Sequence, residues 1–473
     1  MGKIKLGIVG DCGVETGFAT VTHNLIKQLQ DTGEYDIKVI AINYDGRTDN
    51  SWSKWIDMWP ARLGGDLLGI GLVPQLISEF QPNVFLMFQD FWNIPMYISR
   101  LPHDFTGAVT YFPVDAPNIK GQFMMAMAGV TSSICYTEFG RQEAMRGADE
   151  AWVQLKQAAV AEKKHVIDRV FITIGGGMTP FSHQPMQPRQ VPISAARLKQ
   201  MRQKEGHYVI PHGVDVQAFK PLSKKGARKM LGMPIEGFYV GYVARNQSRK
   251  RQDLAIRAFA DFYKNHKDAY LILHCVKTDM QGWDLEQLAE YYKVKDRVLF
   301  THTMFKDAAA TIDQLNLLYN TFDVHINVGG GEGWGLPTFE SAAVGTPQLV
   351  PNWSSTKELW EGSAKLIDIA SVRHEPHQIN TMQAVVDTNS VVNILNELYD
   401  NKVLLSEIGQ KCFEVTQRPE YRWDVVAKKF DAVFKASMGK GIPMQPTAMS
   451  SEGQVEMAKI LKQGHPQIKM STV

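Results

Sequence analysis

The stretch Val328-Gly329-Gly330-Gly331-Glu332-Gly333-Trp334-Gly335-Leu336-Pro337-Thr338-Phe339-Glu340-Ser341-Ala342 combines a strand end, a glycine-rich loop and a helix start. Glycines let a ligand approach the backbone closely. Pro337 suits the first turn of a helix, where a missing N–H costs nothing. The free N–H groups of such a turn favour a phosphate group. The stretch therefore predicts a phosphate-binding turn between a strand and a helix.

Two carboxylates flank this turn, Glu332 in the loop and Glu340 in the early helix. Their spacing lets both side chains face one pocket. Ionised carboxylates are strong hydrogen-bond acceptors for hydroxyl groups. Such a pair on its own would more often be solvated, but the glycine context favours a site. We therefore expect one carboxylate to bind sugar hydroxyls and the other to bind ribose hydroxyls.

Short apolar strands alternate with helical stretches in both halves of the 473 residues. The expected strands are 4–9, 36–42, 83–88 and 108–112 in the first half, and 238–244, 270–273, 298–300, 324–328 and 348–350 in the second. This alternation predicts parallel sheets with helices on both faces. The fold class is therefore α/β, with two Rossmann-like, doubly wound domains that face a cleft. Ligands bind such sheets at the carboxyl ends of the strands.

The domain boundaries follow from the same pattern. A first domain is expected over 1–215 and a second over 216–418, with a sequence break near 211–221. An amphipathic helix is expected over 419–438, because its apolar residues recur at helical spacing. The remaining 439–473 reads as a polar tail.

A pair of cations follows the strand that opens the second domain. Arg245 leaves the end of that strand, and Lys250 lies at the start of the next helix. Two cations aimed at one place would stabilise a departing nucleoside diphosphate. Between the domains the chain reads Ile210-Pro211-His212-Gly213-Val214-Asp215.

Taken together and in this order, these motifs resemble the GT-B glycosyltransferases, and specifically the large retaining family 4. The Glu-x7-Glu element of that family is matched by Glu332 and Glu340, and its Arg/Lys pair by Arg245 and Lys250. The interdomain segment and the glycine loop that ends at Gly17 are similar too. The resemblance covers roughly residues 1–150 and 206–436, and the set of motifs is more specific than any one of them.

The resemblance implies a retaining glycosyltransferase that moves a hexose or pentose from a nucleotide-diphosphate sugar to an acceptor hydroxyl. It implies no cofactor and no metal, and the terminal helix would cross back onto the first domain. The residues implied as catalytic are Arg245, Lys250, Glu332 and Asp115, and those implied as donor-binding are Glu340, Gly335, Leu336, Gly333, Gly17 and Ser355. Glu340 would bind the ribose, Glu332 the transferred sugar, and the two cations the diphosphate.

The chain departs from the family in two places. Many relatives have Gly-Gly-x-x-Glu after the Glu-x7-Glu helix, whereas this chain has Ser354-Ser355-Thr356-Lys357-Glu358. Many relatives also place a histidine on the acceptor side of the first domain. The comparable stretch here is 111–117, which makes Asp115 the candidate for that position.

The segment 151–205 is the clue to a polyanionic partner. It carries nine Lys or Arg against three Asp or Glu, a local charge of +6, and reads as an insertion. We therefore carry the hypothesis that the acceptor is nucleic acid, for instance a hydroxymethylated base in viral DNA. The alternatives are a saccharide or small-metabolite acceptor, with the segment as a solvated surface flap.

Other readings remain open. The four cysteines lie far apart and no apolar run is long enough to span a bilayer, which predicts a cytoplasmic protein without a transmembrane segment. A nucleotide-sugar epimerase or a phosphorylase on the same fold is one alternative function. A non-catalytic protein that binds sugar nucleotides is the other.

Overall fold

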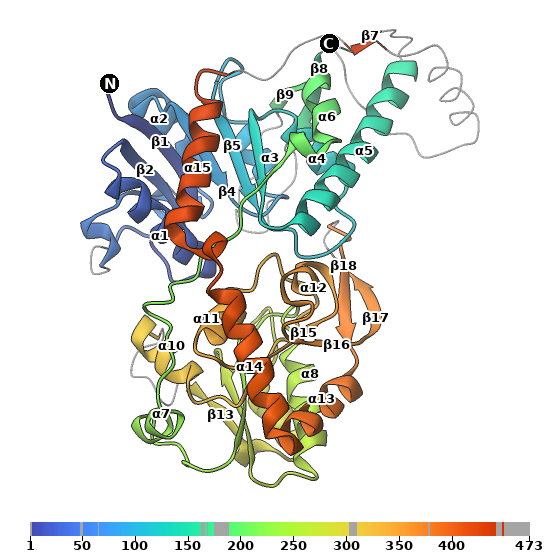
Figure 1. Ribbon diagram of the computed structural model, residues 1–473. Helices are drawn as coiled ribbons and strands as arrows, with labels where there is room; N and C mark the ends of the chain where they lie inside the picture. The colour runs from blue at the N-terminus through green and yellow to red at the C-terminus, as the bar shows by residue number, and fades with distance from the viewer. Residues whose placement is uncertain are drawn as a thin grey trace. The chain divides into compact units, whose positions relative to one another are not determined.

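The computed structural model describes residues 2–47, 51–64, 66–161, 166–167, 169–174, 189–301, 310–376, 379–440 and 447–448. Their contacts divide the chain into two compact units. The first unit comprises Met1–Val114, Asn118–Pro211 and Val426–Val473, and the second comprises Asp115–Pro117 and His212–Val425. Each unit is built around one parallel sheet (Figure 1).

The sheet of the first unit has seven strands in the order β10-β6-β5-β4-β1-β2-β3, and every neighbouring pair is parallel. An order that runs outward in both directions from the first strand is that of a doubly wound fold. The strands are β1 (Ile4–Asp11), β2 (Tyr35–Ile42), β3 (Asp57–Pro60), β4 (Val84–Phe88), β5 (Ala108–Phe112), β6 (Ser132–Cys135) and β10 (Tyr208–Val209).

Helices connect these strands, and α1 shows how the sequence places them. Thr16 caps the helix, because its side chain accepts from the backbone N–H of Ala19, and the buried residues of α1 recur at helical spacing. The helices are α1 (Gly17–Asp31), α2 (Val73–Phe80), α3 (Ile94–Ile98), α4 (Gly121–Met127), α5 (Glu138–Ala161) and α6 (Ala195–Met201).

The last helix, α15 (Trp423–Ser437), packs on the first unit from Val426 onward (Figure 1). The Tyr35 hydroxyl donates to Asp431 at 2.6 Å, and Lys435 pairs with Glu34 at 2.7 Å. The expectation that the terminal helix crosses back to the first domain is therefore confirmed.

The second unit repeats the doubly wound pattern in a six-stranded parallel sheet of order β13-β12-β11-β14-β15-β16. Its strands are β11 (Phe238–Val243), β12 (Ala269–His274), β13 (Val298–Phe300), β14 (Val324–Ile326), β15 (Gln348–Pro351) and β16 (Lys365–Ile367). Its helices are α7 (Lys224–Met230), α8 (Gln252–Tyr263), α9 (Leu285–Tyr291), α10 (Ile312–Tyr319), α11 (Leu336–Ala343), α12 (Ser354–Trp360), α13 (Thr388–Asp400) and α14 (Lys402–Thr416).

Smaller elements complete the described chain. An antiparallel hairpin of β17 (Ile369–His374) and β18 (Met382–Val386) belongs to the second unit. Short 3₁₀ helices lie at Trp52–Lys54, Ala61–Gly64, Ile70–Leu72, Lys204–Gly206, Lys295–Arg297 and Pro419–Tyr421.

The basic segment 151–205 is anchored at both ends. It begins inside α5, and after the antiparallel pair β8 (Arg169–Ile174) and β9 (Arg189–Ser194) it continues into α6, where Ala195, Leu198 and Met201 are buried. Its residues 162–165, 168 and 175–188 lie outside the described part of the chain, as does the tail beyond 440 apart from β19 (Thr447–Ala448), which pairs with β7 (Val166–Ile167).

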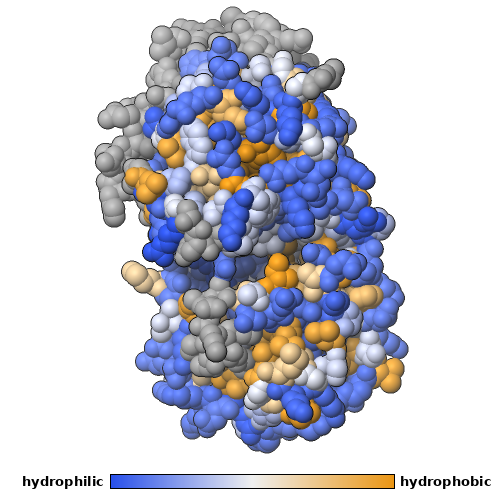
Figure 2. All heavy atoms as spheres, turned by 90° about the vertical axis from the view of Figure 1, so that its left-hand side faces the viewer, coloured by the Kyte–Doolittle hydropathy of each residue, from blue (hydrophilic) through white to orange (hydrophobic). Residues whose placement is uncertain are grey.

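Within the described ranges, no helix has both the length and the apolar composition that crossing a membrane requires. Hydrophilic residues predominate on the face drawn in Figure 2, with apolar residues in separate groups among them.

Candidate functional site

The candidate site lies where the strand order of the second sheet reverses direction. The sheet runs from β11 through β12 to β13 on one side, and from β14 through β15 to β16 on the other. Ligands of doubly wound sheets bind at this switch point, outside the carboxyl ends of the two central strands. The loop after β11 contains Arg245 and Lys250, and the loop after β14 contains Glu332. The topology thus brings the two predicted motifs to one edge of one sheet.

The loop after β11 is held by a buried amide. The Asn246 side chain donates to the carbonyl of Trp283 at 2.7 Å and accepts from the N–H of Trp283 at 3.1 Å. The Gln252 side chain donates to the carbonyl of Arg245 at 2.7 Å. These bonds fix the backbone of Arg245, while its side chain is exposed. The Arg245 side chain is therefore exposed to solvent, while hydrogen bonds hold its backbone in place.

Four charged side chains meet beside this loop, and we call Asp115, Arg249, Lys250 and Glu332 the charge cluster. The Nζ of Lys250 lies 2.5 Å from Oε1 of Glu332. The Nη1 of Arg249 lies 3.5 Å from Oε2 of Glu332 and 3.3 Å from Oδ2 of Asp115. Asp115 follows β5 in the chain, yet its contacts assign it to the second unit. Two cations and two carboxylates therefore form one neutral group.

The members of the charge cluster set one another's protonation. Burial would raise the pKa of Glu332, but the charges of Lys250 and Arg249 hold that pKa below its usual value. Burial, with the neighbouring Arg249, lowers the pKa of Lys250, and Glu332 opposes this. Burial raises the pKa of Asp115 against the attraction of Arg249. Removing any one member changes the ionisation of the other three.

Glycines shape the turn from β14 into α11. Gly335 has a φ of 90° at the N-cap of α11, a backbone conformation that favours glycine. A Cβ on Gly331 would lie 2.2 Å from the carbonyl oxygen of Asp115, so only glycine fits there. The backbone N–H of Gly333 bonds the Asp115 carboxylate. The helix then begins at Leu336, and a proline occupies its first turn.

Glu340 lies in a different environment from Glu332. Its carboxylate accepts a 2.7 Å hydrogen bond from the Tyr319 hydroxyl. Burial raises the pKa of Glu340 to about 7, although the bond from Tyr319 lowers it in part. The two carboxylates of the Glu-x7-Glu element thus have separate partners, one in the charge cluster and one at the end of α10.

The remaining donor-binding candidates lie at helix starts. Ser355 is buried in the first turn of α12, directly after Ser354. Gly17 is the first residue of α1 and belongs to the first unit.

Ser354 has a φ of 47°, a conformation in which a side chain costs roughly 1–2 kcal/mol. We expect Ser354→Gly to raise the free energy of unfolding by about 0.5–1 kcal/mol, because the relief of strain exceeds the added entropy of the unfolded glycine. The urea midpoint measures this change. Ser354→Ala is the matched control, since it removes the hydroxyl and keeps the strain. A glycine variant no more stable than the alanine variant would contradict the prediction.

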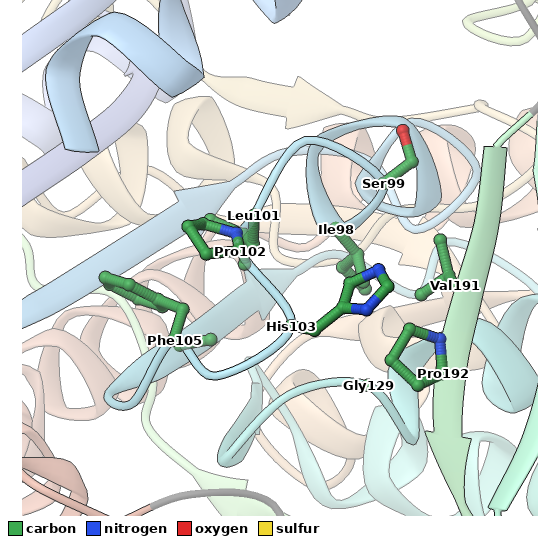
Figure 3. Close-up of a pocket in the computed structure, with 10 residues that line it drawn as sticks. Ile98, Ser99, Leu101, Pro102, His103, Phe105, Gly129, Val191 and Pro192 are labelled. Carbon is green, nitrogen blue, oxygen red and sulfur yellow. The ribbon is translucent and has the colours of Figure 1, made fainter. Parts of the chain in front are cut away.

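A separate hollow lies in the first unit (Figure 3). Its lining residues are largely apolar, with the His103 ring among them: Ile98, Ser99, Leu101, Pro102, His103, Phe105, Ala108, Gly129, Val191 and Pro192. Ala108 is the first residue of β5, so the hollow lies at the amino end of that strand. Because ligands of such sheets bind at the opposite edge, it is not part of the candidate site.

Several residues of the site are not singled out by the sequence. Arg249 stands in the run Arg249-Lys250-Arg251, where nothing distinguishes it from a solvated cation. Tyr319 and Asn246 sit in ordinary helical and loop surroundings. The available signal for Arg249 was its position directly before Lys250, in the loop that follows β11.

No family model matches the chain. A stretch of it is 33% identical over 146 residues to the D-inositol 3-phosphate glycosyltransferase of Acidothermus cellulolyticus, which is 29% of this chain and 31% of that protein. The matched stretch thus spans about a third of the length of this curated relative.

Among solved structures, the sucrose-phosphate synthase of Thermosynechococcus elongatus superposes with a TM-score of 0.60 at 14% identity, over 92% of this chain and 99% of that one. The Anabaena protein Alr3699/HepE, solved in complex with UDP-glucose, gives a TM-score of 0.59 at 14% identity, over 92% and 100%.

The class of protein that the fold defines is therefore the GT-B class. The expected pair of Rossmann-like, parallel-sheet domains is confirmed. The resemblance to family 4 glycosyltransferases rests on the motifs, and the matched curated relative is itself named a glycosyltransferase.

Proposed function

We propose that the protein transfers a sugar from a nucleotide-diphosphate sugar to an acceptor hydroxyl. The observation that carries this proposal is the charge cluster at the switch point of the second sheet, beside the glycine start of α11. Cations next to a helix N-terminus suit a diphosphate, and the adjoining carboxylates suit hydroxyl groups. The curated relative that matches part of the chain is named a glycosyltransferase.

The proposed roles follow the motifs. Glu340 binds the ribose, Glu332 the transferred sugar, and Arg245 and Lys250 the diphosphate. These two cations supply the positive charge that the leaving group requires, so we propose that transfer proceeds without a bound metal. Further contacts to the donor are assigned to Gly333, Gly335, Leu336, Gly17 and Ser355.

The proposed chemistry retains the configuration of the sugar. The acceptor oxygen forms its bond to the anomeric carbon on the face from which the diphosphate leaves, as the bond to the phosphate oxygen breaks. The acceptor proton passes to that phosphate oxygen. Asp115, held by Arg249, is proposed to orient the acceptor hydroxyl.

The acceptor is proposed from charge. The basic segment 151–205 supports a polyanion, such as hydroxymethylated viral DNA, and a saccharide or small metabolite is the second candidate. One of its cations is not available to a polyanion, because Arg197 is 3% exposed and donates to the carbonyls of Val130 and Gly206. Binding to DNA that does not weaken steeply with added salt would exclude the polyanion.

The donor test is stabilisation by a panel of nucleotide sugars, beginning with UDP-glucose and including both hexoses and pentoses. A donor at about 100 times its dissociation constant adds roughly 2.7 kcal/mol to the free energy of unfolding. Arg245→Ala should abolish this gain without changing the unliganded melting temperature, because the side chain is exposed. Arg257→Ala, an exposed arginine on α8, is the matched control. The proposal fails if no nucleotide sugar stabilises the protein.

The raised pKa of Glu340 predicts a pH-dependent donor affinity. Only the ionised carboxylate is a strong acceptor for ribose hydroxyls, so a group with a pKa of about 7 should bind the donor about tenfold more weakly at pH 6 than at pH 8. Tyr319→Phe should move this transition to higher pH, because it removes the hydrogen bond that lowers the pKa. Titration calorimetry with one nucleotide sugar across this range measures both effects.

The control for this pH dependence is Glu340→Gln, which should bind the donor weakly and equally at both pH values. The same shift affects stability in the opposite direction. The folded pKa lies above the unfolded value, so the contribution of Glu340 to stability is lost as pH rises through about 7. An affinity that stays constant from pH 6 to 8 in the unmodified protein would contradict this assignment.

A further inference from the structure

Arg249 bonds the glycine loop through both its backbone and its side chain. Its carbonyl accepts from the N–H of Gly330 at 2.8 Å, and its Nη1 donates to the carbonyl of Gly331 at 2.5 Å. The same Nη1 reaches the carboxylates of Asp115 and Glu332 at 3.3 and 3.5 Å. One side chain therefore connects the loop after β11, the loop after β14 and the segment that carries Asp115.

The segment Asp115–Pro117 is fitted closely against the second unit. The close approach of Asp115 to Gly331 leaves no room for a Cβ, and the carbonyl of Pro117 accepts from the N–H of Met382 at 2.9 Å. Arg249 lies 3.3 Å from the Asp115 carboxylate, and both it and Lys250 bring positive charge to this segment. Arg249 thus contacts both Asp115 and Glu332 and joins the two carboxylates.

Arg249 also balances the negative charge of Glu332 within the charge cluster. Glu332 is 8% exposed and has two cationic neighbours, Lys250 and Arg249. A buried carboxylate without a cation is costly. When Lys250 turns to a diphosphate, Arg249 remains to neutralise Glu332.

The geometry points to Arg249 as a positioning residue of the transfer site: it holds Asp115 and Glu332 in place and releases Lys250 for the diphosphate. This inference rests on the proposed function and adds to it a residue that the family motifs do not include. Because the contacts to Gly331, Asp115 and Glu332 run through Nη1, a lysine can replace part of them.

The test compares Arg249→Gln with Arg249→Lys. We expect Arg249→Gln to lower kcat for donor hydrolysis or transfer by about 100-fold with a change in donor KM of about threefold or less, because the lost interaction concerns the reacting groups. Arg249→Lys should have a kcat about tenfold higher than that of Arg249→Gln. The acid limb of the kcat/KM profile of Arg249→Gln should move to higher pH, because Glu332 and Asp115 lose a cation that lowers their pKa values.

The matched control is Arg251→Gln. Arg251 pairs with Asp253 at 2.9 Å, and its loss removes the same charge two residues along the chain. It should leave kcat within about twofold of the unmodified protein. Equal kinetics and equal pH profiles for Arg249→Gln and Arg251→Gln would overturn the inference.

Amide hydrogen exchange separates this inference from the proposed function. The N–H of Gly333 bonds the Asp115 carboxylate, so it should exchange faster in Arg249→Gln than in Arg251→Gln. If the unmodified protein turns over no nucleotide sugar, the proposed function fails and the exchange result alone decides whether Arg249 positions the loop. Unchanged exchange at Gly333 overturns the inference whatever the kinetics show.

Discussion

Replacing Lys250 with methionine should reduce turnover by about 1,000-fold while the protein stays folded. Lys250 is the half-buried cation of the proposed diphosphate site, and a donor removed from such a site costs about 100-fold to 1,000-fold in kcat. The loss also leaves Glu332 with Arg249 as its cation, which raises the pKa of Glu332 and weakens it as an acceptor. Methionine keeps the apolar stem, so packing around β11 is preserved.

The measurement is steady-state transfer or hydrolysis of the donor that stabilises the protein best, together with the melting temperature of each variant. Lys264→Met is the matched control, because Lys264 is an exposed lysine that pairs with Asp261 on α8. Turnover of Lys250→Met within tenfold of the unmodified protein would place the diphosphate elsewhere.

Replacing Asp323 with alanine should lower the free energy of unfolding by about 3–5 kcal/mol. The Asp323 carboxylate accepts from Arg228 at 2.6 Å, from Lys224 at 2.7 Å and from the N–H of Tyr239 at 2.8 Å. The Arg228 side chain is 5% exposed, so losing the carboxylate leaves a buried guanidinium without its counter-ion. Removing one partner of a buried ion pair costs this much.

Urea unfolding of the full chain, followed by intrinsic fluorescence, measures the shift in midpoint. Asp261→Ala is the control, because it breaks an exposed pair on α8 whose contribution is about 0–1 kcal/mol. A loss below about 1 kcal/mol for Asp323→Ala would mean that the carbonyl acceptors of Arg228, which include Thr321 and Ile235, hold its charge without a carboxylate.

Much of the sheet architecture can be predicted from hydrophobic patterning. The expected strands at 4–9, 83–88 and 238–244 correspond to β1, β4 and β11, because buried parallel strands read as continuous apolar runs. The pattern does not predict the strand β6 (Ser132–Cys135), because this strand is short and half polar. The pattern also does not predict the hairpin of β17 and β18, because its pairing depends on residues brought together by the fold.

The residues of the candidate site likewise fall into two groups, those that the sequence predicts and those that it does not. The spacing of Glu332, Glu340 and Lys250 marks them in the sequence, because the turns that carry them have a recognisable glycine and proline chemistry. The interaction of Arg249 with Asp115 links positions far apart in the chain, and a single sequence holds no signal for such a pair. The sequence placed Asp115 in the first domain, whereas its contacts are with the second.

The path of the chain limits how the two compact units can be exchanged between proteins of this kind. The boundaries at 114/115, 117/118, 211/212 and 425/426 mean that neither unit is one continuous piece of the gene. A recombinant fragment of 212–425 would carry Arg249 and Glu332 but leave behind Asp115–Pro117. Grafting that fragment onto a foreign partner to move the charge cluster therefore also requires a three-residue patch in the recipient.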